Sequence, residues 1–513
     1  VSPPTPDASK PYGTVTDGDG KFIFEVLDPG RYTLSAERAG YLRQAYGAKA
    51  GQMNGSTLTL APGQHMSAIA ITMAPQAVLM GRVLDEDGEP MGRAQIRVLQ
   101  MGYRQGKRGP IVRMGNGTDE NGQFRITGLS PGRYFVCAGV PFARSSVEAL
   151  RSASASHPQT KAPREDYAPT CYPNSSDVEG ATLIDLPAGR EVSGLDIRLR
   201  KSTVVRVKGQ ISGGVPGNSY DQIQVSLQSA GDSATVLFGG SVQVNRKGNF
   251  ELPSVHPGSY RLVAMNYQGQ TQTLGVQPLE VGTEDIQDVV LSLVPPSDLK
   301  GRIILEGDPK PPAPGETPPA PPLMHVQLYS RDVPNFYGYA TAADDGTFTI
   351  ANVAPARNYT LTVSVPPGGY VRSVRLGEQD MPQHSIDLSS ASGSELQINV
   401  KMAAGEVDGS VTDGNSQPAS GAVITIIPDP PNPELQYLYH QTRTDQNGAF
   451  QVKSVAPGNY TVYAWEELES GAQFDPDFLK PFSSKSEHVT MSENGRAQLN
   501  LTRIPAPAGG NAR

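Results

Sequence analysis

The amino-acid sequence predicts an all-β protein of five tandem antiparallel β-sandwiches with an immunoglobulin-like or transthyretin-like fold, the first of which lacks its opening strands. The chain has 513 residues, which is too many for one hydrophobic core. It contains 55 Gly and 45 Pro, with Val, Thr, Ser and Tyr in short runs, and this composition is typical of short strands joined by turns. A phrase of 19 residues recurs five times at the spacing of whole domains.

The recurring phrase predicts a hairpin followed by a second turn. Its first copy reads TDGDGKFIFEVLDPGRYTL, and the later copies cover 118–136, 244–262, 343–361 and 444–462. Asp or Asn with Gly forms the first turn, because Gly tolerates positive φ and Asx side chains bond nearby backbone groups. A strand that opens with Phe follows, and then Pro-Gly-x-Tyr. We expect this Tyr to pack in the core with its hydroxyl on a backbone carbonyl. The fourth copy, PARNY, has a second turn that is one residue longer.

The closing strands of the repeats set the expected domain boundaries. The expected units are an incomplete sandwich at 1–75, a sandwich at 76–201 with an insertion at 141–170 that includes a short helix, a sandwich at 202–296, a sandwich at 297–404 with a proline-rich loop at 309–322, a sandwich at 405–505, and a tail at 506–513. The joins between units are short, and some contain proline, so neighbouring units have little freedom. We therefore expect a semi-rigid rod on the order of 150–200 Å long.

The first unit lacks the part that precedes the hairpin in the other units. Only fifteen residues stand before its hairpin phrase, and twelve of them read VSPPTPDASKPY, whose prolines do not suit a central strand. Its sheet edge should be bare, so a strand of another chain could complete it, and head-to-tail completion produces filaments. Cleavage of the front half is the alternative, and it is compatible with such assembly. The candidate interface residues are Val1, Pro3, Pro4, Tyr12, Phe22 and Phe24.

The two cysteines, Cys137 and Cys171, form either one disulfide or two buried thiols. A bridge would close a loop of about 35 residues. In the chain-entropy model such a loop stabilises the fold by roughly 3–4 kcal/mol. A bridge would also favour an oxidising, extracytoplasmic compartment.

No pattern in the sequence indicates a catalytic centre, a metal site or a cofactor. The seven histidines are scattered without the spacing of zinc ligands. The acidic stretches at 17–20 and 85–90 lack a full calcium-binding loop and indicate turns. Acidic and basic residues are interspersed at a net charge of −8, which does not favour nucleic acid, and no apolar run is long enough to span a membrane. We therefore expect a protein that is not an enzyme.

A carbohydrate site would need exposed aromatic side chains. The candidate platform is Tyr337 and Tyr339, which alternate along one strand and so share a face, together with Trp465, the single tryptophan. The same alternation also fits packing in a core or an interface.

Several motifs resemble the carboxypeptidase regulatory-like domain. They are G-x-V-x-D-x-x-G-x-P, T-D-x-x-G-x-F, L-x-P-G-x-Y and a late L-x-A/P-G strand pair, and together they cover nearly the whole chain in five copies. That domain is a transthyretin-like sandwich and is similar also to collagen-binding B-type domains of surface proteins. Tandem arrays of this style resemble those in secreted proteins of soil bacteria such as acidobacteria. The resemblance implies a stalk, spacer or adhesion unit and not a catalyst.

These observations together predict a secreted or cell-surface structural protein. The expected partner is a second copy of the chain, joined head to tail in a filament or matrix. The alternative is a secreted adhesion protein that binds carbohydrate, peptide or other surface proteins, with the sandwiches as spacers.

Overall fold

The computed structural model folds into tandem antiparallel β-sandwiches, so the expected all-β fold class is confirmed. In the part of the chain that the structure describes, helical structure is confined to short segments such as α2 (Pro476–Leu479). None of the helices in the described residues is long and apolar enough to cross a bilayer. The structure describes residues 12–48, 55–104, 106–140, 164–213, 220–229, 240–268, 271–307, 324–331, 337–354, 358–382, 384–388 and 393–506.

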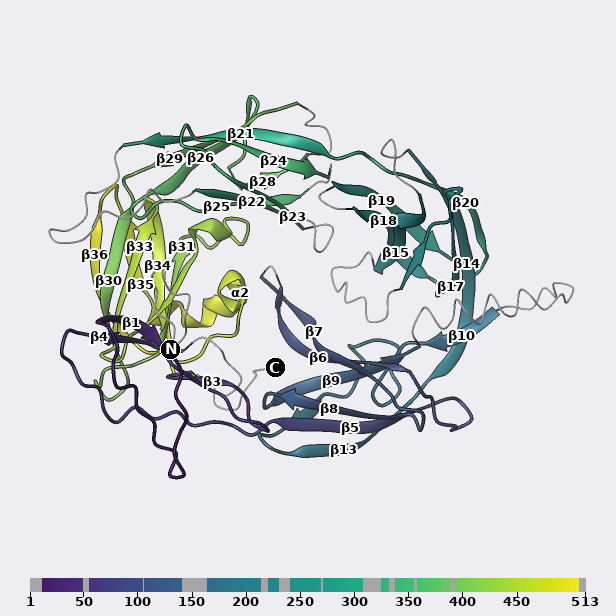
Figure 1. Ribbon diagram of the computed structural model, residues 1–513, viewed down its shortest axis with the longest axis horizontal. Helices are drawn as coiled ribbons and strands as arrows, with labels where there is room; N and C mark the ends of the chain where they lie inside the picture. The colour runs from purple at the N-terminus through teal and green to yellow at the C-terminus, as the bar shows by residue number, and fades with distance from the viewer. Residues whose placement is uncertain are drawn as a thin grey trace, which may run out of the picture.

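From residue 77 onward, four units share one topology for their first sheet (Figure 1). The first strand of each unit is β5 (Ala77–Leu84), β14 (Arg200–Ser212), β21 (Ser297–Glu306) or β30 (Gly405–Thr412). On one edge it pairs antiparallel with the hairpin strand, which is β8 (Gln123–Leu129), β17 (Asn249–Val255), β24 (Thr347–Val353) or β33 (Ala449–Val455). On the other edge it pairs parallel with the closing strand, which is β13 (Glu191–Arg198), β20 (Ile286–Ser292), β29 (Leu396–Lys401) or β36 (Arg496–Thr502). The first strand of each unit is therefore a central strand, hydrogen-bonded on both edges.

The second sheet of each unit contains the strand that carries the recurrent tyrosine. These strands are β9 (Gly132–Gly139), β18 (Gly258–Gln268), β25 (Tyr359–Val363) and β34 (Gly458–Trp465). In the second unit β9 pairs antiparallel with β6 (Gln95–Arg104), which also pairs with β7 (Lys107–Gly117), and in the third unit β18 pairs with β15 (Ile223–Ser229) and β19 (Thr271–Val281). In the fourth unit β25 pairs with β22 (His325–Ser330), which also pairs with β23 (Tyr337–Thr341). In the last unit β34 pairs with β31 (Val423–Pro428) and β35 (Glu487–Met491). Apolar side chains that alternate along the strands fill the space between the two sheets of each unit.

The recurrent tyrosine has the role predicted for it. In four of the five copies its hydroxyl donates a hydrogen bond to the backbone carbonyl four residues earlier, as from Tyr460 to Ala456 at 2.9 Å. In the fourth copy Tyr359 instead donates to Ala354, five residues earlier, because the second turn is one residue longer. Burial raises the pKa of both phenols, so they remain neutral donors.

The described residues of the N-terminal unit, 12–48 and 55–75, contain only short strands. Its described pairs are β1 (Gly30–Thr33) with β4 (Thr57–Leu60), and β2 (Ser35–Ala36) with β3 (Gln44–Ala45). Its fully buried core is small and consists of Tyr32, Leu34 and Leu58. The described residues of this unit therefore form fewer and shorter strands than those of the four units that follow.

Both insertions lie largely outside the described residues, including the expected short helix and the proline-rich loop at 309–322. The described end of the first insertion forms β10 (Arg164–Ala168) and β11 (Thr170–Cys171). β10 pairs antiparallel with β14, the first strand of the next unit. This pairing adds a strand from the insertion of the second unit to the sheet of the third unit.

The expectation of an extended rod is wrong, because the units curve into a closed ring (Figure 1). The hairpin of β6 and β7 meets the last unit, where the rings of Tyr103 and Phe478 have centroids 5.9 Å apart. The N-terminal unit also touches the last unit through two hydrogen bonds of 3.4 Å between the backbone of Thr59 and the side-chain amide of Gln446. Short joins fix the angle between neighbours, but they do not make it straight, and bends of one sense add up.

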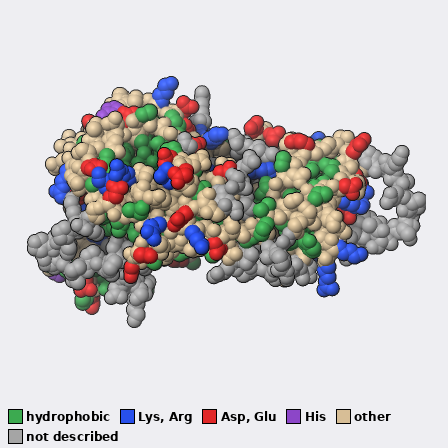
Figure 2. Space-filling model, turned by 90° about the horizontal axis from the view of Figure 1, so that it is seen from above, with side chains coloured by type: hydrophobic (Ala, Val, Ile, Leu, Met, Phe, Trp, Pro, Cys, Tyr) green, Lys and Arg blue, Asp and Glu red, His purple; other side chains and the backbone are tan. Residues whose placement is uncertain are grey.

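Charged side chains are scattered over the described part of the surface. The face drawn in Figure 2 shows acidic and basic groups interspersed, with no basic stripe among its coloured side chains.

Candidate binding surfaces

The N-terminal unit contains two segments that belong to no strand, although their counterparts in the other units do. Residues 21–28 follow the first turn, where the other units have the hairpin strand. Residues 64–74 lead to the second unit, where the others have the closing strand. In the complete units one central strand separates these two strands and pairs with both. No described residue of the N-terminal unit takes that place, and we call the place the open slot.

Apolar side chains border the open slot without being fully covered. Phe22 and Phe24 are half-buried, and their ring centroids lie 6.2 Å apart. Ile69 and Ile71 contact the same small core from the second segment. Ile23 is 68% exposed. The equivalents of Phe22 in the four complete units are only 3–6% exposed, so a complete sheet would cover these side chains further.

Of the other predicted interface residues, Val1, Pro3 and Pro4 lie outside the described residues. Tyr12 is 38% exposed, and its ring meets the ring of Tyr32 edge-on with centroids 6.4 Å apart. The structure therefore brings Tyr12 to the same small core that Phe22 and Phe24 contact.

Three exposed tyrosines lie on one face of the sheet that contains β22 and β23. Tyr337 and Tyr339 alternate along β23, as predicted, and Tyr329 on β22 pairs directly with Tyr337. They are 61%, 49% and 49% exposed. The hydroxyl of Tyr329 donates to Gln327 Oε1 at 2.8 Å, and the ring of Tyr339 stacks on that of His325 with centroids 5.4 Å apart. These five residues form the tyrosine face.

A cavity of about 290 Å³ opens beside the tyrosine face and is lined by three units. Tyr329, Arg331 and Thr360 come from the fourth unit, and Arg331 Nε donates to Thr360 Oγ1 at 2.6 Å. Arg104 comes from the end of β6, and Gln436 comes from the last unit. No sequence pattern indicated these lining residues, because only closure of the ring brings the three units together.

Trp465 is not part of an exposed platform, so its assignment to a carbohydrate site is wrong. Its side chain is 2% exposed, and its indole Nε1 donates to Thr425 Oγ1 at 2.9 Å. The indole stacks on Tyr463 with centroids 5.1 Å apart and meets the ring of Phe482 edge-on at 5.0 Å. The segment between β34 and β35, which contains α2, packs over the tryptophan. This segment carries no repeat motif, so the sequence did not predict that it buries Trp465.

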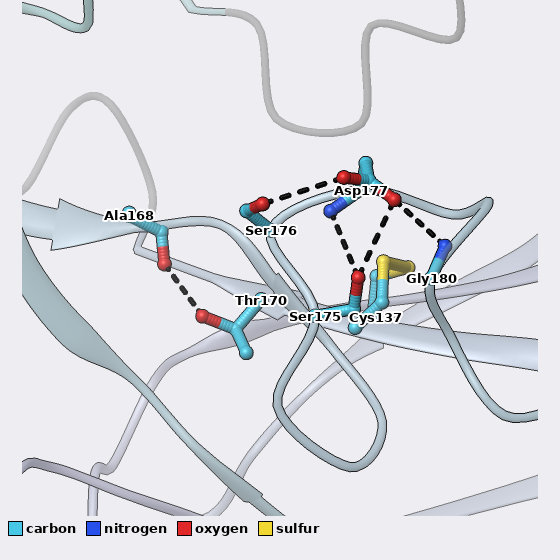
Figure 3. Close-up of a disulfide and its surroundings, with 8 residues drawn as sticks. Cys137, Ala168, Thr170, Ser175, Ser176, Asp177 and Gly180 are labelled. Atoms are coloured by element: carbon cyan, nitrogen blue, oxygen red, sulfur yellow. Dashed lines mark hydrogen bonds between the residues drawn. A yellow bond between two sulfur atoms is a disulfide. The ribbon is translucent and has the colours of Figure 1, made fainter.

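Cys137 and Cys171 form a disulfide between the adjacent strands β9 and β11 (Figure 3). Both residues are buried against Leu99. The loop that follows is held by Asp177, whose Oδ1 accepts a hydrogen bond from the backbone N–H of Gly180 at 2.7 Å (Figure 3). The bridge thus fastens the end of the insertion to the strand that the insertion leaves.

The acidic turn sequences form local hydrogen bonds. Asp85 Oδ1 accepts from the backbone N–H groups of Asp87 and Glu89 at 3.0 and 2.9 Å, and Asp17 makes the same kind of turn. This is the turn chemistry predicted for these stretches. Across the described ranges, no three His, Cys, Asp or Glu side chains are grouped so that they could hold a metal ion.

The last unit combines every element of the repeat, with Gly409 in its central strand, Phe450 after the first turn and Tyr460 after the second. Residues 406–502 match the carboxypeptidase regulatory-like domain. The resemblance drawn from the motifs is therefore confirmed for this unit. No curated protein matches the chain.

The chain is also similar to solved structures of bacterial proteins, two of them pilins, at low sequence identity. The TIE protein of Bacillus anthracis is 13% identical, with 93% of this chain and 75% of that chain covered and a TM-score of 0.14. The major pilin subunit BcpA of Bacillus cereus is 9% identical, with 83% and 99% covered and a TM-score of 0.16. The minor pilin of Streptococcus agalactiae is 15% identical, with 42% and 100% covered and a TM-score of 0.19. TM-scores this low do not support a transfer of function from these proteins.

Proposed function

We propose that this protein is a non-catalytic structural protein of the cell surface or extracellular space that assembles by strand addition between copies. The observation that carries the proposal is the open slot in the N-terminal unit. Residues 21–28 and 64–74 present backbone N–H and C=O groups and half-buried apolar side chains that a sheet would cover. A strand from a neighbouring copy hydrogen-bonds these backbone groups and also covers the apolar side chains.

The assembly proposed here is a filament or matrix of rings. Addition of a strand from one copy to the slot of the next is a heterologous contact, and heterologous contacts that do not close extend without limit. The contacts between the second and the last unit keep each subunit compact, so the repeating object is the ring and not an extended rod.

The proposed location and the lack of catalysis rest on separate observations. A buried disulfide is typical of proteins that fold in oxidising compartments, which supports a place outside the cytoplasm. The proposal of a non-catalytic role is supported by the match of residues 406–502 to the carboxypeptidase regulatory-like domain.

Electron microscopy and light scattering of the purified chain at rising concentration test the proposal. We expect oligomers or filaments, and we expect the double substitution Phe22→Asp and Phe24→Asp to reduce assembly by about tenfold or more, because carboxylates are costly beside an apolar sheet surface. The matched control is Tyr337→Asp with Tyr339→Asp, two charges placed on the tyrosine face. A monodisperse monomer at high concentration, or equal assembly of both double variants, contradicts the proposal.

A second candidate function is carbohydrate binding, which the tyrosine face favours. Exposed phenol rings offer flat apolar surfaces for stacking and a polar tip for hydrogen bonds. Gln327 adds a side-chain amide, and the nearby Arg331 adds a cation that suits an acidic sugar.

Binding of the chain to a glycan array tests this second candidate. We expect Tyr329→Ser combined with Tyr337→Ser to weaken binding at least about tenfold, since aromatic anchors carry most of the affinity in such sites. The control is Val290→Ser, which changes an exposed apolar residue of the third unit. Absence of any bound glycan, or equal binding by both variants, excludes this function.

A further inference from the structure

The tyrosine face lies on the inner side of the ring. Figure 1 shows the sheet that contains β22, β23 and β25 nearer the middle of the ring than the first sheet of the same unit. The core of the fourth unit lies between these two sheets, so the opposite face of the inner sheet, which carries Tyr329, Tyr337 and Tyr339, points into the ring. A ligand on this face is therefore close to other units of the same chain.

The cavity of about 290 Å³ beside this face holds two arginines from different units. Arg331 follows β22 in the fourth unit, and Arg104 ends β6 in the second. The other lining side chains carry hydroxyl groups or, in Gln436, an amide, and none carries a carboxylate. Within the described ranges, neither guanidinium forms an ion pair with an acidic side chain. The cavity therefore has a surplus of positive charge in a chain whose net charge is −8.

The guanidinium of Arg331 is held in place without the use of its terminal amino groups. Its Nε donates to Thr360 Oγ1 at 2.6 Å, and the backbone N–H of Arg331 donates to the carbonyl of Asn358 at 2.9 Å. No described residue accepts a hydrogen bond from Nη1 or Nη2 of this side chain. A guanidinium binds a planar carboxylate through two parallel hydrogen bonds from such N–H groups. This fixed arginine thus suits an anionic ligand.

We propose that the cavity binds a uronic acid residue of an acidic oligosaccharide, with its carboxylate between Arg104 and Arg331. A cavity of this volume is near the lower end of small-molecule sites, about 300 Å³, and so takes one sugar ring. Tyr329 lines the cavity and pairs with Tyr337 on the neighbouring strand, so the phenol rings continue the site for the next sugars. The inference rests on the second candidate function, carbohydrate binding, and identifies the class of sugar.

Closure of the ring assembles this site, because Arg104 belongs to the hairpin that contacts the last unit. A ligand that contacts both arginines binds only the closed ring, and so it stabilises closure by mass action. We expect Tyr103→Asp, which disrupts the contact with Phe478, to weaken binding of the acidic sugar although it changes no residue of the lining.

Isothermal titration calorimetry of the full chain tests the inference with two forms of one trisaccharide. They are tri-galacturonic acid and the same trisaccharide with all its carboxyl groups methyl-esterified. We expect the acid to bind at least about tenfold more tightly, because the ester forms no charge-assisted hydrogen bonds with the arginines. Overall charge does not produce this preference, since the net charge of −8 repels an acid. Acetate, a carboxylate without a sugar ring, should bind at least about tenfold more weakly than the acidic trisaccharide.

The substitutions Arg104→Gln and Arg331→Gln each remove one charge from the cavity. We expect each to weaken binding of the acid at least about tenfold and to leave binding of the ester unchanged, which distinguishes a loss of charge from a loss of fold. The matched control is Arg190→Gln, at an exposed position before β13 in the same unit as Arg104, and it should bind both forms as wild type does.

Equal affinity for the acid and the ester overturns this inference and leaves carbohydrate binding in place. Binding of the acid that both arginine variants retain in full, or binding of acetate as tight as that of the trisaccharide, also overturns it. Full affinity in Tyr103→Asp contradicts the dependence of the site on ring closure. If neither form binds while other glycans of the array do, the inference alone is wrong, and if no glycan binds at all, carbohydrate binding is wrong with it.

Discussion

At the scale of single residues, His384 is an imidazole buried where two units meet. Its ring stacks on that of Tyr437 from the last unit, with centroids 3.7 Å apart, and it is 4% exposed. The hydroxyl of Tyr437 donates to the carbonyl of Pro382 at 3.3 Å. Burial lowers the pKa of His384 to about 4, so the contact is built around a neutral ring.

This burial predicts a loss of stability in mild acid. Because the pKa of His384 is about 4 in the folded chain and near 6.5 in the unfolded chain, the unfolded chain takes up the proton first as the pH falls. The contribution is complete above about pH 6.5 and is lost progressively toward about pH 4, by up to about 3 kcal/mol. Urea unfolding between pH 7.5 and 4 measures it.

His384→Asn should flatten this pH dependence, because asparagine tolerates the positive φ of 52° at this position and does not titrate. His65→Asn, at an exposed position, is the matched control and should leave it unchanged. If wild type and His384→Asn lose stability in parallel, another group is responsible. His256 and His440, whose pKa burial also lowers, continue to titrate in both.

At this scale the sequence predicted what depends on near neighbours. The sequence predicted that the hydroxyl of the recurrent tyrosine bonds a backbone carbonyl, and the acceptor lies only four or five residues away, within the same turn. The burial of His384 and Trp465 was not predictable, because the groups that cover them belong to another unit or to an irregular insertion.

At the scale of elements, two segments of the N-terminal unit are not strands, because no described central strand lies between them to pair with both. The sequence predicted that the opening strands of this unit are absent, but it also predicted a strand that opens with Phe22 and a closing strand at the end of the unit. Neither is a strand in the structure. An extended segment becomes a strand only when a neighbour accepts its hydrogen bonds, and both segments depend on the same neighbour.

The pairing of β10 with β14 is a second result at this scale. The insertion has no repeat pattern, so the sequence assigned it no place in a sheet. Its described end nevertheless extends the sheet of the third unit, while the disulfide holds it to the second. Together these two attachments limit rotation between the second and third units.

At the scale of the whole molecule, closure of the ring depends on the contact between the β6–β7 hairpin and the last unit. Tyr103 packs against Phe478, and a Cβ atom added to Gly106 would lie 2.4 Å from the carbonyl oxygen of Phe474. The cavity beside the tyrosine face also depends on this closure, since Arg104 stands at the end of the same hairpin.

Tyr103→Asp should open the ring, because the carboxylate faces the aromatic cluster of the last unit without a compensating hydrogen bond. We expect the radius of gyration from small-angle X-ray scattering to rise, while circular dichroism stays unchanged because no sandwich core is altered. Tyr337→Asp, the same substitution at an exposed tyrosine, is the control. Identical scattering from the two variants would show that this contact does not hold the ring closed.

The sequence by itself determined the fold class, the repeat, its turns and the buried tyrosine. Each of these follows from periodicity and from contacts within a single hairpin or sandwich. Only the tertiary structure decided that the cysteines pair, that Trp465 is covered, that three units share one cavity and that the chain closes into a ring. These features depend on the angles at short joins and on the packing of irregular segments, and such contacts between residues far apart in sequence leave no periodic pattern in the chain.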